Sequence, residues 1–283
     1  MIHVYVVSAF SKDGGGGNRA GVVLNRPELT PAQKMAAAAA LGYSETAFVT
    51  ASDRADWKIE YFTPTEEVPL CGHATIASFT LLHRLGRLSA GEFMMETKAG
   101  LLRMAVSGEG TVRMEQNRPV YGEVLAVQEL AGCVEAGAVH TDLPVQVVST
   151  GLRDILLPIA SRRALAALAP DLKTMKALSR ARDVTGVHAF ALSEEAGISA
   201  YCRNFAPLVG IDEEAATGTS SCALACYLAA HGMRRDRYVF EQGHELGAPS
   251  RITVELSFDG SSGIDGVFAG GTGYLVCERD LEL

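Results

Sequence analysis

Two short segments of the sequence have the residue types and the position of anion-binding loops. Gly72-His73 stands just before the nearly apolar stretch ATIASFTLL, and Gly218-Thr219 stands just before SSCALACYLAA. Both stretches are predicted to be helical, and the first backbone N–H groups of a helix lie unpaired at the positive end of its dipole. Such ends bind anions, so a small carboxylate is the expected ligand. The alternative is that these residues only cap the helices.

The six cysteines favour neither a disulfide framework nor a metal site. They are scattered along 283 residues without a C-x-x-C pair, and a chain of this length needs no disulfide staples. Cys222 and Cys226 are four residues apart in a predicted helix, but two soft ligands without a partner pair make a weak zinc site. We therefore expect reduced thiols and no metal ion.

The glycine run from Gly14 to Gly17 is similar to a phosphate-binding loop only in composition. No Lys-Ser or Lys-Thr pair follows it, and no acidic residue closes a nucleotide-binding unit about 20 residues further on. We expect a flexible loop here.

The segments that must position the two helix starts form an internal repeat. Four matches occur in the same order in both halves, with offsets between 141 and 146 residues: His3–Ser8 with Pro144–Ser149, Ala47-Phe48 with Ala189-Phe190, Phe62-x-Pro64 with Phe205-x-Pro207, and Gly72 with Gly218. A drift of so few residues over four ordered matches indicates two homologous halves. If the halves face each other across a cleft, both helix starts can point at one substrate.

Each half is predicted to hold short strands, an F-x-P turn and one long helix. The helices are expected over about residues 73–83 and 219–230, and both are apolar on all sides, as in a helix wrapped by a curved sheet. The stretch Val267–Val276 is predicted to be the last strand. The sequence therefore predicts an α+β fold of two pseudo-repeated domains. The first covers residues 1–120 and is joined by the C-terminal strand 266–283, and the second covers residues 121–265.

Charge and hydropathy exclude several classes of partner. The chain has 25 Lys+Arg against 33 Asp+Glu, a formal net charge of -8, so it repels phosphate backbones and anionic lipid surfaces. We expect no nucleic acid and no membrane as partner. The N-terminus has no targeting segment, and no apolar run reaches transmembrane length. A cytoplasmic protein is expected.

Seven short motifs, taken in order, resemble the PhzF family of phenazine biosynthesis, whose members share the fold of diaminopimelate epimerase. They are Gly17–Leu24, Ser44–Val49, Phe62–Pro64, Cys71–Thr75, Glu213–Gly218, Gln242-Gly243 and Gly247–Ser250. The resemblance spans nearly the whole chain. It implies two domains, each a strongly curved, mostly antiparallel sheet around a central helix, with the active site between them. It also implies a homodimer and an isomerase that needs neither metal nor cofactor.

The resemblance also implies roles for individual residues. Glu45 would move a proton between carbon positions of a small cyclic or unsaturated carboxylic acid, and so shift a double bond; His73 and Glu214 are the other implied catalytic residues. The implied substrate-binding residues are Asn18, Ser44, Gly72, Gly218, Thr219, Gln242 and Gly243. Without the resemblance, Glu45 would be interpreted as an exposed strand-edge residue and His73 as a capping or structural histidine.

Three positions depart from the family pattern. Glu214 and Ala215 stand where the family has aspartate and proline, and Ala248 stands where relatives commonly carry arginine. A carboxylate is kept at residue 214, but its side chain is longer. The resemblance therefore does not fix the natural substrate.

Two other functions compete with this interpretation. Racemases and epimerases of the same fold use two cysteines, one at the start of each central helix. Cys71 occupies the first position, but its repeat mate is Thr217, whose hydroxyl is far too weakly acidic for proton exchange at neutral pH. The sequence thus argues against a two-thiol amino-acid racemase and leaves Cys71 as a buried structural thiol or a bystander. A non-catalytic metabolite-binding protein is the second alternative.

Overall fold

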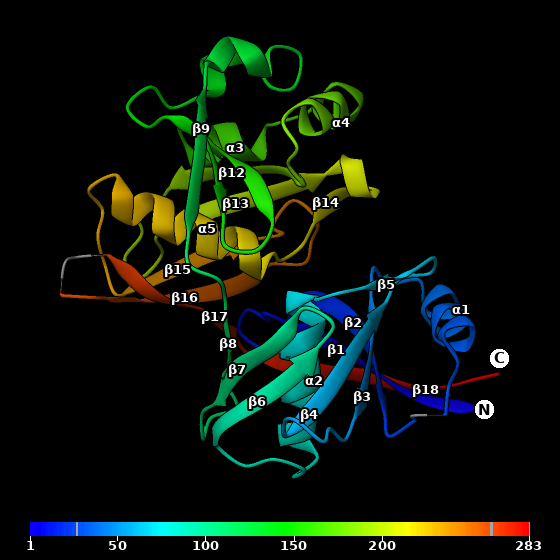
Figure 1. The fold of residues 1–283 in the computed structure, drawn as a ribbon. Coiled ribbons are helices and arrows are strands. Elements are labelled where there is room, and N and C mark those ends of the chain that lie inside the picture. Colours follow the sequence, from blue (N-terminus) through cyan, green and yellow to red (C-terminus); the bar gives the residue numbers. More distant parts are fainter. Residues whose placement is uncertain (27, 261–262, 283) are drawn as a thin grey trace. The chain divides into compact units, whose positions relative to one another are not determined.

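The chain divides into two units, and the computed structural model describes its residues 1–26, 28–260 and 263–282. Unit 1 consists of Met1–Glu115 and Gly270–Leu283, and unit 2 of Gln116–Ala269 (Figure 1). The C-terminal segment thus groups with the N-terminal half. Among the described residues, no helix is both long and apolar enough to cross a membrane.

Unit 1 is a curved sheet that encloses one helix. Its strands are β1 (Ile2–Ala9), β2 (Asn18–Leu24), β3 (Thr46–Thr50), β4 (Trp57–Phe62), β5 (Glu67–Val68), β6 (Gly91–Thr97), β7 (Gly100–Val106), β8 (Val112–Glu115) and β18 (Gly273–Leu281), and its helices are α1 (Pro31–Leu41) and α2 (Gly72–Arg84). The strands pair in the order β18-β1-β2-β3-β4-β6-β7-β8. All of these pairings are antiparallel except β2 with β3 and β4 with β6, which are parallel.

Unit 2 repeats this plan. Its strands are β9 (Val120–Leu125), β10 (Val145–Ser149), β11 (Arg153–Pro158), β12 (Gly186–Leu192), β13 (Ala200–Ala206), β14 (Ile211–Glu214), β15 (Arg237–Gln242), β16 (Ser250–Phe258) and β17 (Ile264–Gly271), and its helices are α3 (Arg162–Ala166), α4 (Leu172–Ala181) and α5 (Gly218–Ala230). The pairing order β9-β10-β11-β12-β13-β15-β16 has its parallel pairs at the same places, β11 with β12 and β13 with β15. This correspondence confirms the repeat of two α+β halves.

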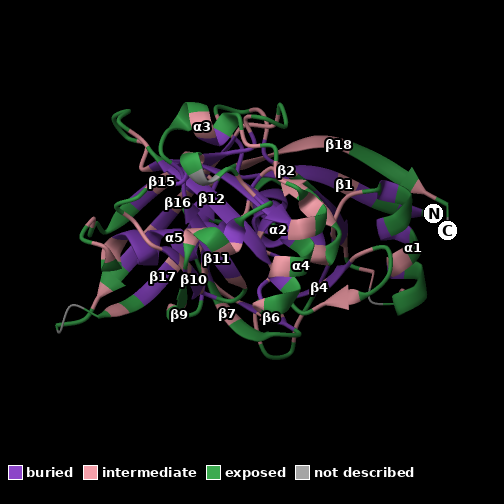
Figure 2. Cartoon of the chain, turned by 90° about the horizontal axis from the view of Figure 1, so that it is seen from above, coloured by how far each residue is buried: buried purple, intermediate pink, exposed green. Residues whose placement is uncertain are grey.

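The central helices α2 and α5 are each 13 residues long and begin at the paired glycines Gly72 and Gly218. The helices predicted from the apolar stretches are therefore confirmed to within a residue or two. Helix α2 packs against β1, β2, β3, β8 and β18, and α5 packs against β10, β11 and β16. Both are buried on nearly every side, as the colouring of Figure 2 shows, which is why their sequences have no polar face.

Shorter helices cover the outer face of each sheet. Helix α1 begins with a capping box, in which the Thr30 side chain accepts from the Gln33 amide and the Gln33 side chain accepts from the Thr30 amide. This reciprocal arrangement fixes the first turn. Buried apolar residues under α1, such as Phe48 and Phe62, form one outer core. A second apolar core, which includes Leu165 of α3 and Met175 of α4, lies in unit 2.

The prediction of one strand over Val267–Val276 is wrong. This stretch contains parts of two strands, β17 and β18, which are separated at Thr272. Glycines around Thr272 break the apolar pattern, and one of them is required by packing, since a Cβ on Gly273 would lie 2.6 Å from the Ser8 carbonyl oxygen. β18 then pairs with β1 as an edge strand of unit 1.

Candidate functional site

Glu45 lies at the point where β3 enters the core of unit 1. Every residue of β3 is buried, and the strand lies so close to β2 that a Cβ on Gly21 would meet the Thr46 hydroxyl at 2.9 Å. This packing carries Glu45 inward, and its side chain is only 15% exposed. The alternative interpretation of Glu45 as an exposed strand-edge carboxylate is therefore wrong.

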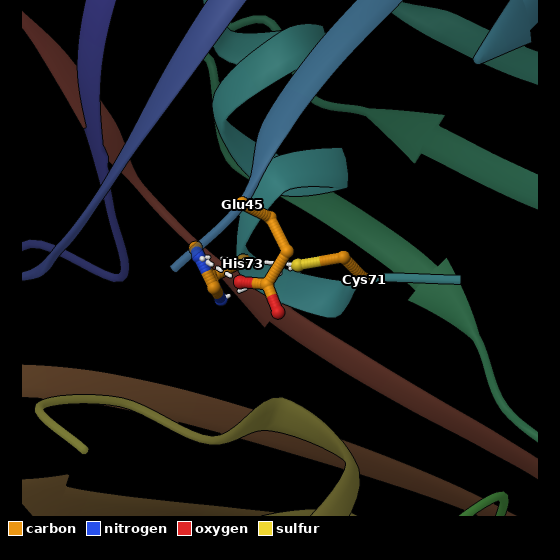
Figure 3. Close-up of side chains that lie close together, drawn as sticks. All are labelled: Glu45, Cys71 and His73. Atoms are coloured by element: carbon orange, nitrogen blue, oxygen red, sulfur yellow. Dashed lines mark hydrogen bonds and ion pairs between the residues drawn. The ribbon is translucent and has the colours of Figure 1, made fainter. Parts of the chain in front are cut away.

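His73 and Cys71 come from the start of α2 and meet Glu45. The His73 Nε2 atom lies 3.4 Å from Glu45 Oε2 and 3.5 Å from the Ser44 hydroxyl. Cys71 Sγ lies 3.5 Å from His73 Nδ1 and 3.9 Å from Nε2. Figure 3 shows the three side chains of Glu45, Cys71 and His73 turned toward one another.

The Glu45 carboxylate has one oxygen atom enclosed by protein. Oε2 is buried and accepts no hydrogen bond in the described structure, although the His73 imidazole is its neighbour at 3.4 Å. A buried polar atom without a hydrogen bond costs about 1–3 kcal/mol and in a native protein calls for an explanation. A carboxylate oxygen that is largely shielded from water is suited to accept and release a proton.

Neither central helix is capped by a side chain at its start. The N-cap residues are Cys71 for α2 and Thr217 for α5, and neither side chain makes a capping hydrogen bond. Their equivalent positions confirm that Thr217 is the repeat mate of Cys71. Both starts thus keep the features of an anion-binding helix end, a dipole and glycine at the first position.

In unit 2 the predicted residues Glu214 and Gln242 belong to one hydrogen-bonded group. Gln242 Nε2 donates to the Glu214 carbonyl oxygen at 2.7 Å and to the Thr217 hydroxyl at 3.1 Å. The same hydroxyl donates to the Glu214 carboxylate at 3.1 Å. Thr219, the second residue of α5, donates to Gln116 Oε1 at 3.1 Å. The Glu214 carboxylate is therefore folded back onto the N-cap residue of α5.

Gly243 directly follows β15 and packs closely against the loop that precedes α5. Its φ is +78°, and a Cβ at this position would lie 2.5 Å from the Ala248 carbonyl oxygen and 2.7 Å from the Ala215 carbonyl oxygen. Both of these neighbours are backbone atoms, which cannot rotate away.

Substitution of Gly243 by alanine is expected to lower the stability of unit 2 by more than about 1 kcal/mol, because the residue becomes strained at positive φ and also collides with backbone. Urea unfolding followed by circular dichroism measures this loss. The matched control is Gly247→Ala, since Gly247 also has positive φ, +65°, but nothing within 4 Å of its Cβ position. Equal losses in the two variants would contradict the packing role of Gly243.

A buried polar network beneath the first turn of α5 could not be found from the sequence. Ser220 donates to Asp154 Oδ2 at 2.5 Å, and Asn204 Nδ2 contacts Ser220 at 3.3 Å and His188 Nδ1 at 3.1 Å. All four residues are at most 3% exposed. Burial raises the pKa of Asp154 and lowers the pKa of His188 to about 3, so this histidine is neutral. The one sign of this network in the local sequence was Asp154, an aspartate near the start of the apolar strand β11.

The structure places the predicted site residues in two groups. In unit 1, Glu45, Ser44 and His73 come together at the Gly72 end of α2, and Asn18 begins β2, where it pairs with Ala9. In unit 2, Glu214, Gln242 and Gly243 surround the start of α5, which is formed by Gly218 and Thr219. From the sequence, Cys71 was expected to be only a structural thiol or a bystander. In the structure its thiol lies inside the first group. Its spacing of two residues from His73 at a helix start was the available signal.

The groups differ in their chemistry, although their positions repeat. Where unit 1 has Cys71 and His73 at the start of its central helix, unit 2 has Thr217 and Thr219. Among these paired positions, an imidazole and a thiol therefore occur only at the helix start of unit 1.

Comparison with known proteins connects this architecture to one family. Residues 7–279 match the family model PhzC-PhzF, described as phenazine biosynthesis-like protein. A Deinococcus radiodurans protein named as an uncharacterized isomerase is 38% identical over 281 residues, covering 94% of this chain and 90% of that protein. The trans-2,3-dihydro-3-hydroxyanthranilate isomerase of Pseudomonas aeruginosa is 30% identical over 289 residues, covering 97% of this chain and 100% of that protein.

A solved structure agrees with these sequence matches. The crystal structure of a PhzF-family phenazine biosynthesis protein from Bacillus anthracis superimposes with a TM-score of 0.91 at 28% identity, covering 100% of this chain and 99% of that one. The fold class expected from the repeat and from the resemblance is confirmed. The chain belongs to the PhzF family of phenazine biosynthesis-like proteins and is an isomerase.

Proposed function

We propose that this isomerase moves a proton between two carbon atoms of a small cyclic or unsaturated carboxylic acid, and that Glu45 carries the proton. The observation that supports this most is the Glu45 Oε2 atom, which is buried without a hydrogen bond beside His73. A base in this setting can take a proton from a carbon atom without competing water.

In the proposed reaction one base makes and breaks every bond to the moving proton. Glu45 takes the proton from the first carbon, the electron pair of that C–H bond becomes the new double bond, and the old double bond opens toward the second carbon. The proton on Glu45, whose side chain is 15% exposed, exchanges with solvent; Glu45 then delivers a proton to the second carbon and regains its charge. Atoms and electrons balance within the substrate, so the reaction is an isomerisation.

The neighbours of Glu45 have supporting roles in this proposal. His73, whose Nε2 is 3.4 Å from Oε2, orients the carboxylate. The start of α2 at Gly72 binds the substrate carboxylate with its backbone N–H groups, as helix N-termini bind anions. Ser44, 3.5 Å from His73 Nε2, completes the polar side of the pocket.

For unit 2 we propose contacts to the substrate from Glu214, Gln242 and the start of α5 at Gly218. The Glu214 carboxylate accepts from Thr217, which accommodates the extra methylene relative to the family's aspartate by folding the side chain back. A shifted carboxylate changes which hydroxyl or amino group of a substrate is recognised, because hydrogen bonds discriminate steeply with position.

The first substrate to test is trans-2,3-dihydro-3-hydroxyanthranilate, the compound in the name of the Pseudomonas aeruginosa relative at 30% identity. The protein is incubated in deuterated water with this compound and with a panel of β,γ-unsaturated and cyclohexadiene carboxylic acids, and NMR follows deuterium entering carbon positions. We expect isomerisation and deuterium incorporation for at least one unsaturated acid and none for its saturated analogue. The proposal fails if no unsaturated acid exchanges.

The racemase alternative predicts a different pattern in the same assay. A two-base enzyme exchanges the α-proton of an amino acid, and this exchange would be lost in Cys71→Ala and kept in Glu45→Gln. We expect the opposite result, since Thr217 occupies the second thiol position.

A further inference from the structure

The group formed by Glu45, Cys71 and His73 has the composition of a zinc site. One carboxylate oxygen, one thiol sulfur and one imidazole nitrogen lie within 4.8 Å of one another. Zinc binds these three ligand types, and three protein ligands with one open position are typical of accessible zinc sites. The residues come from only two places in the chain, the start of β3 and the start of α2, and both are fixed by buried elements.

The distances within the group match those that a tetrahedral ion imposes. Bonds of about 2.3 Å to sulfur and about 2.0–2.2 Å to nitrogen and oxygen put sulfur about 3.5 Å and oxygen about 3.4 Å from the nitrogen. In the structure Cys71 Sγ is 3.5 Å from one imidazole nitrogen of His73 and 3.9 Å from the other. Glu45 Oε2 is 3.4 Å from His73 Nε2. With Nε2 as the ligand nitrogen, two distances need to shorten: the 3.9 Å from sulfur to Nε2 and the gap between sulfur and oxygen, within 4.8 Å. Rotation of the Cys71 and Glu45 side chains would close both.

The burial of the three ligand side chains also favours binding of the ion. The side chains of His73 and Glu45 are 5% and 15% exposed, and Cys71 is 8% exposed. Glu45 Oε2 accepts no hydrogen bond, so a cation bound to this atom satisfies a buried charge instead of displacing a bond. Because electrostatic attraction is stronger where water is excluded, the gain is larger than at a surface carboxylate.

We propose that Glu45, Cys71 and His73 bind one Zn²⁺ ion per chain, and that the bound ion reversibly blocks proton transfer. The ion takes the Glu45 carboxylate and the imidazole, so neither can act on a substrate, and water fills the fourth position. Binding displaces the thiol proton of Cys71 to solvent. The inhibition rests on the proposed function of Glu45, whereas the binding does not. One ion is expected because Thr217 and Thr219 stand at the equivalent positions of unit 2.

Zinc binding is tested on the full chain by calorimetric titration with ZnSO₄ after the thiols are reduced. We expect one ion per chain for the wild type and a loss of affinity in Cys71→Ser greater than the 10–100-fold typical of losing an outer-shell partner. Serine is a favourable N-cap residue, so this variant should keep α2. The matched control is Cys277→Ser in the same unit, which should bind zinc as the wild type does. Mg²⁺, which prefers oxygen ligands, should not bind.

A spectroscopic readout separates this site from other thiols. Co²⁺ in place of Zn²⁺ should give a thiolate charge-transfer absorption in the wild type and in Cys277→Ser, and none in Cys71→Ser. The proposal is overturned if the wild type takes up no zinc, or if Cys71→Ser binds zinc and shows the cobalt band as the wild type does.

The inhibition is measured separately with whichever substrate the exchange assay finds. Zinc should abolish turnover of the wild type and a chelator should restore it, whereas the turnover that Cys71→Ser shows without zinc should persist when zinc is added. Sensitivity of Cys71→Ser equal to that of the wild type would overturn the inhibitory role. If no substrate is found, the proposed function fails, while calorimetry and the cobalt spectrum still decide whether the site binds metal.

Discussion

Substitution of Glu45 by glutamine is expected to reduce turnover by on the order of 10²–10⁴-fold, the contribution usual for a positioned acid–base group. Glutamine has nearly the same shape and keeps the side chain in its pocket, but an amide neither accepts nor returns a proton at neutral pH. The substrate contacts proposed for Ser44, Gly72 and the other polar groups would remain. We therefore expect kcat to fall while KM changes little, which steady-state kinetics on the identified substrate would measure.

The control for this prediction is Glu109→Gln. Glu109 is exposed in the turn beside Gly110, whose Cβ position lies 3.2 Å from His83, near the opposite end of α2 from His73. This variant loses the same charge from the same unit and should turn over at the wild-type rate. A Glu45→Gln variant that keeps more than about a tenth of the wild-type kcat would contradict an acid–base role of the usual size.

Substitution of Arg203 by alanine is expected to destabilise unit 2 by about 3–5 kcal/mol, the cost of breaking a buried ion pair by removing one partner. Arg203 donates to both oxygens of Glu213 at 2.8 and 2.7 Å and to the carbonyl oxygens of Leu165 and Leu168. The two charged side chains are 8% and 12% exposed. Alanine removes the Arg203 donor from a buried carboxylate and from two carbonyl oxygens, of which that of Leu165 still accepts from the Leu168 amide, and urea unfolding would show the loss.

Two further variants separate the ion pair from general packing. Arg203→Met combined with Glu213→Leu should lose less stability than Arg203→Ala, because no unpaired charge remains inside. Arg103→Ala breaks a bidentate but exposed pair with Glu115 and should leave the unfolding transition almost unchanged. Equal losses in the double variant and in Arg203→Ala would show that the lost side-chain volume and the carbonyl contacts dominate.

Loss of the Arg203 pair should also affect the candidate site. Glu213 precedes Glu214 in β14, and the next residues lead to the start of α5. With Glu213 unpaired, the backbone of this loop is less well fixed, so KM should rise more than kcat falls. Kinetics of Arg203→Ala below its unfolding temperature would measure this, and an unchanged KM would mean that Gln242 alone, through its bond to the Glu214 carbonyl oxygen, holds the loop.

The sequence predicted the parts of the fold that are periodic or repeated. The two central helices were identifiable because apolar residues cover all their sides and glycines precede them, and their starts at Gly72 and Gly218 agree with the prediction. The repeat was visible because its offsets drift by only a few residues. The last strand was not predicted correctly, since the break at Thr272 is accompanied by the close packing of Gly273 against the Ser8 carbonyl oxygen, a tertiary contact that hydropathy does not reveal.

The candidate site was predictable only through the family motifs. Nothing in the local pattern around Glu45 distinguishes it from a surface carboxylate; its enclosure comes from β3 being buried on both faces. The network of Asp154, His188, Asn204 and Ser220 joins three strands and a helix, so no sequence window contains it. Polar contacts of this kind depend on tertiary packing, which single-sequence patterns do not encode.

The proton-carrying role of Glu45 is tested most directly by deuterium transfer in single turnovers. Excess enzyme in deuterated water is mixed with the identified substrate, and NMR counts deuterium at the carbon that gains the proton. We predict incorporation at that carbon in the wild type and in Glu109→Gln, and none on the same timescale in Glu45→Gln. Incorporation by Glu45→Gln at the wild-type rate would contradict the assignment of Glu45 as the base.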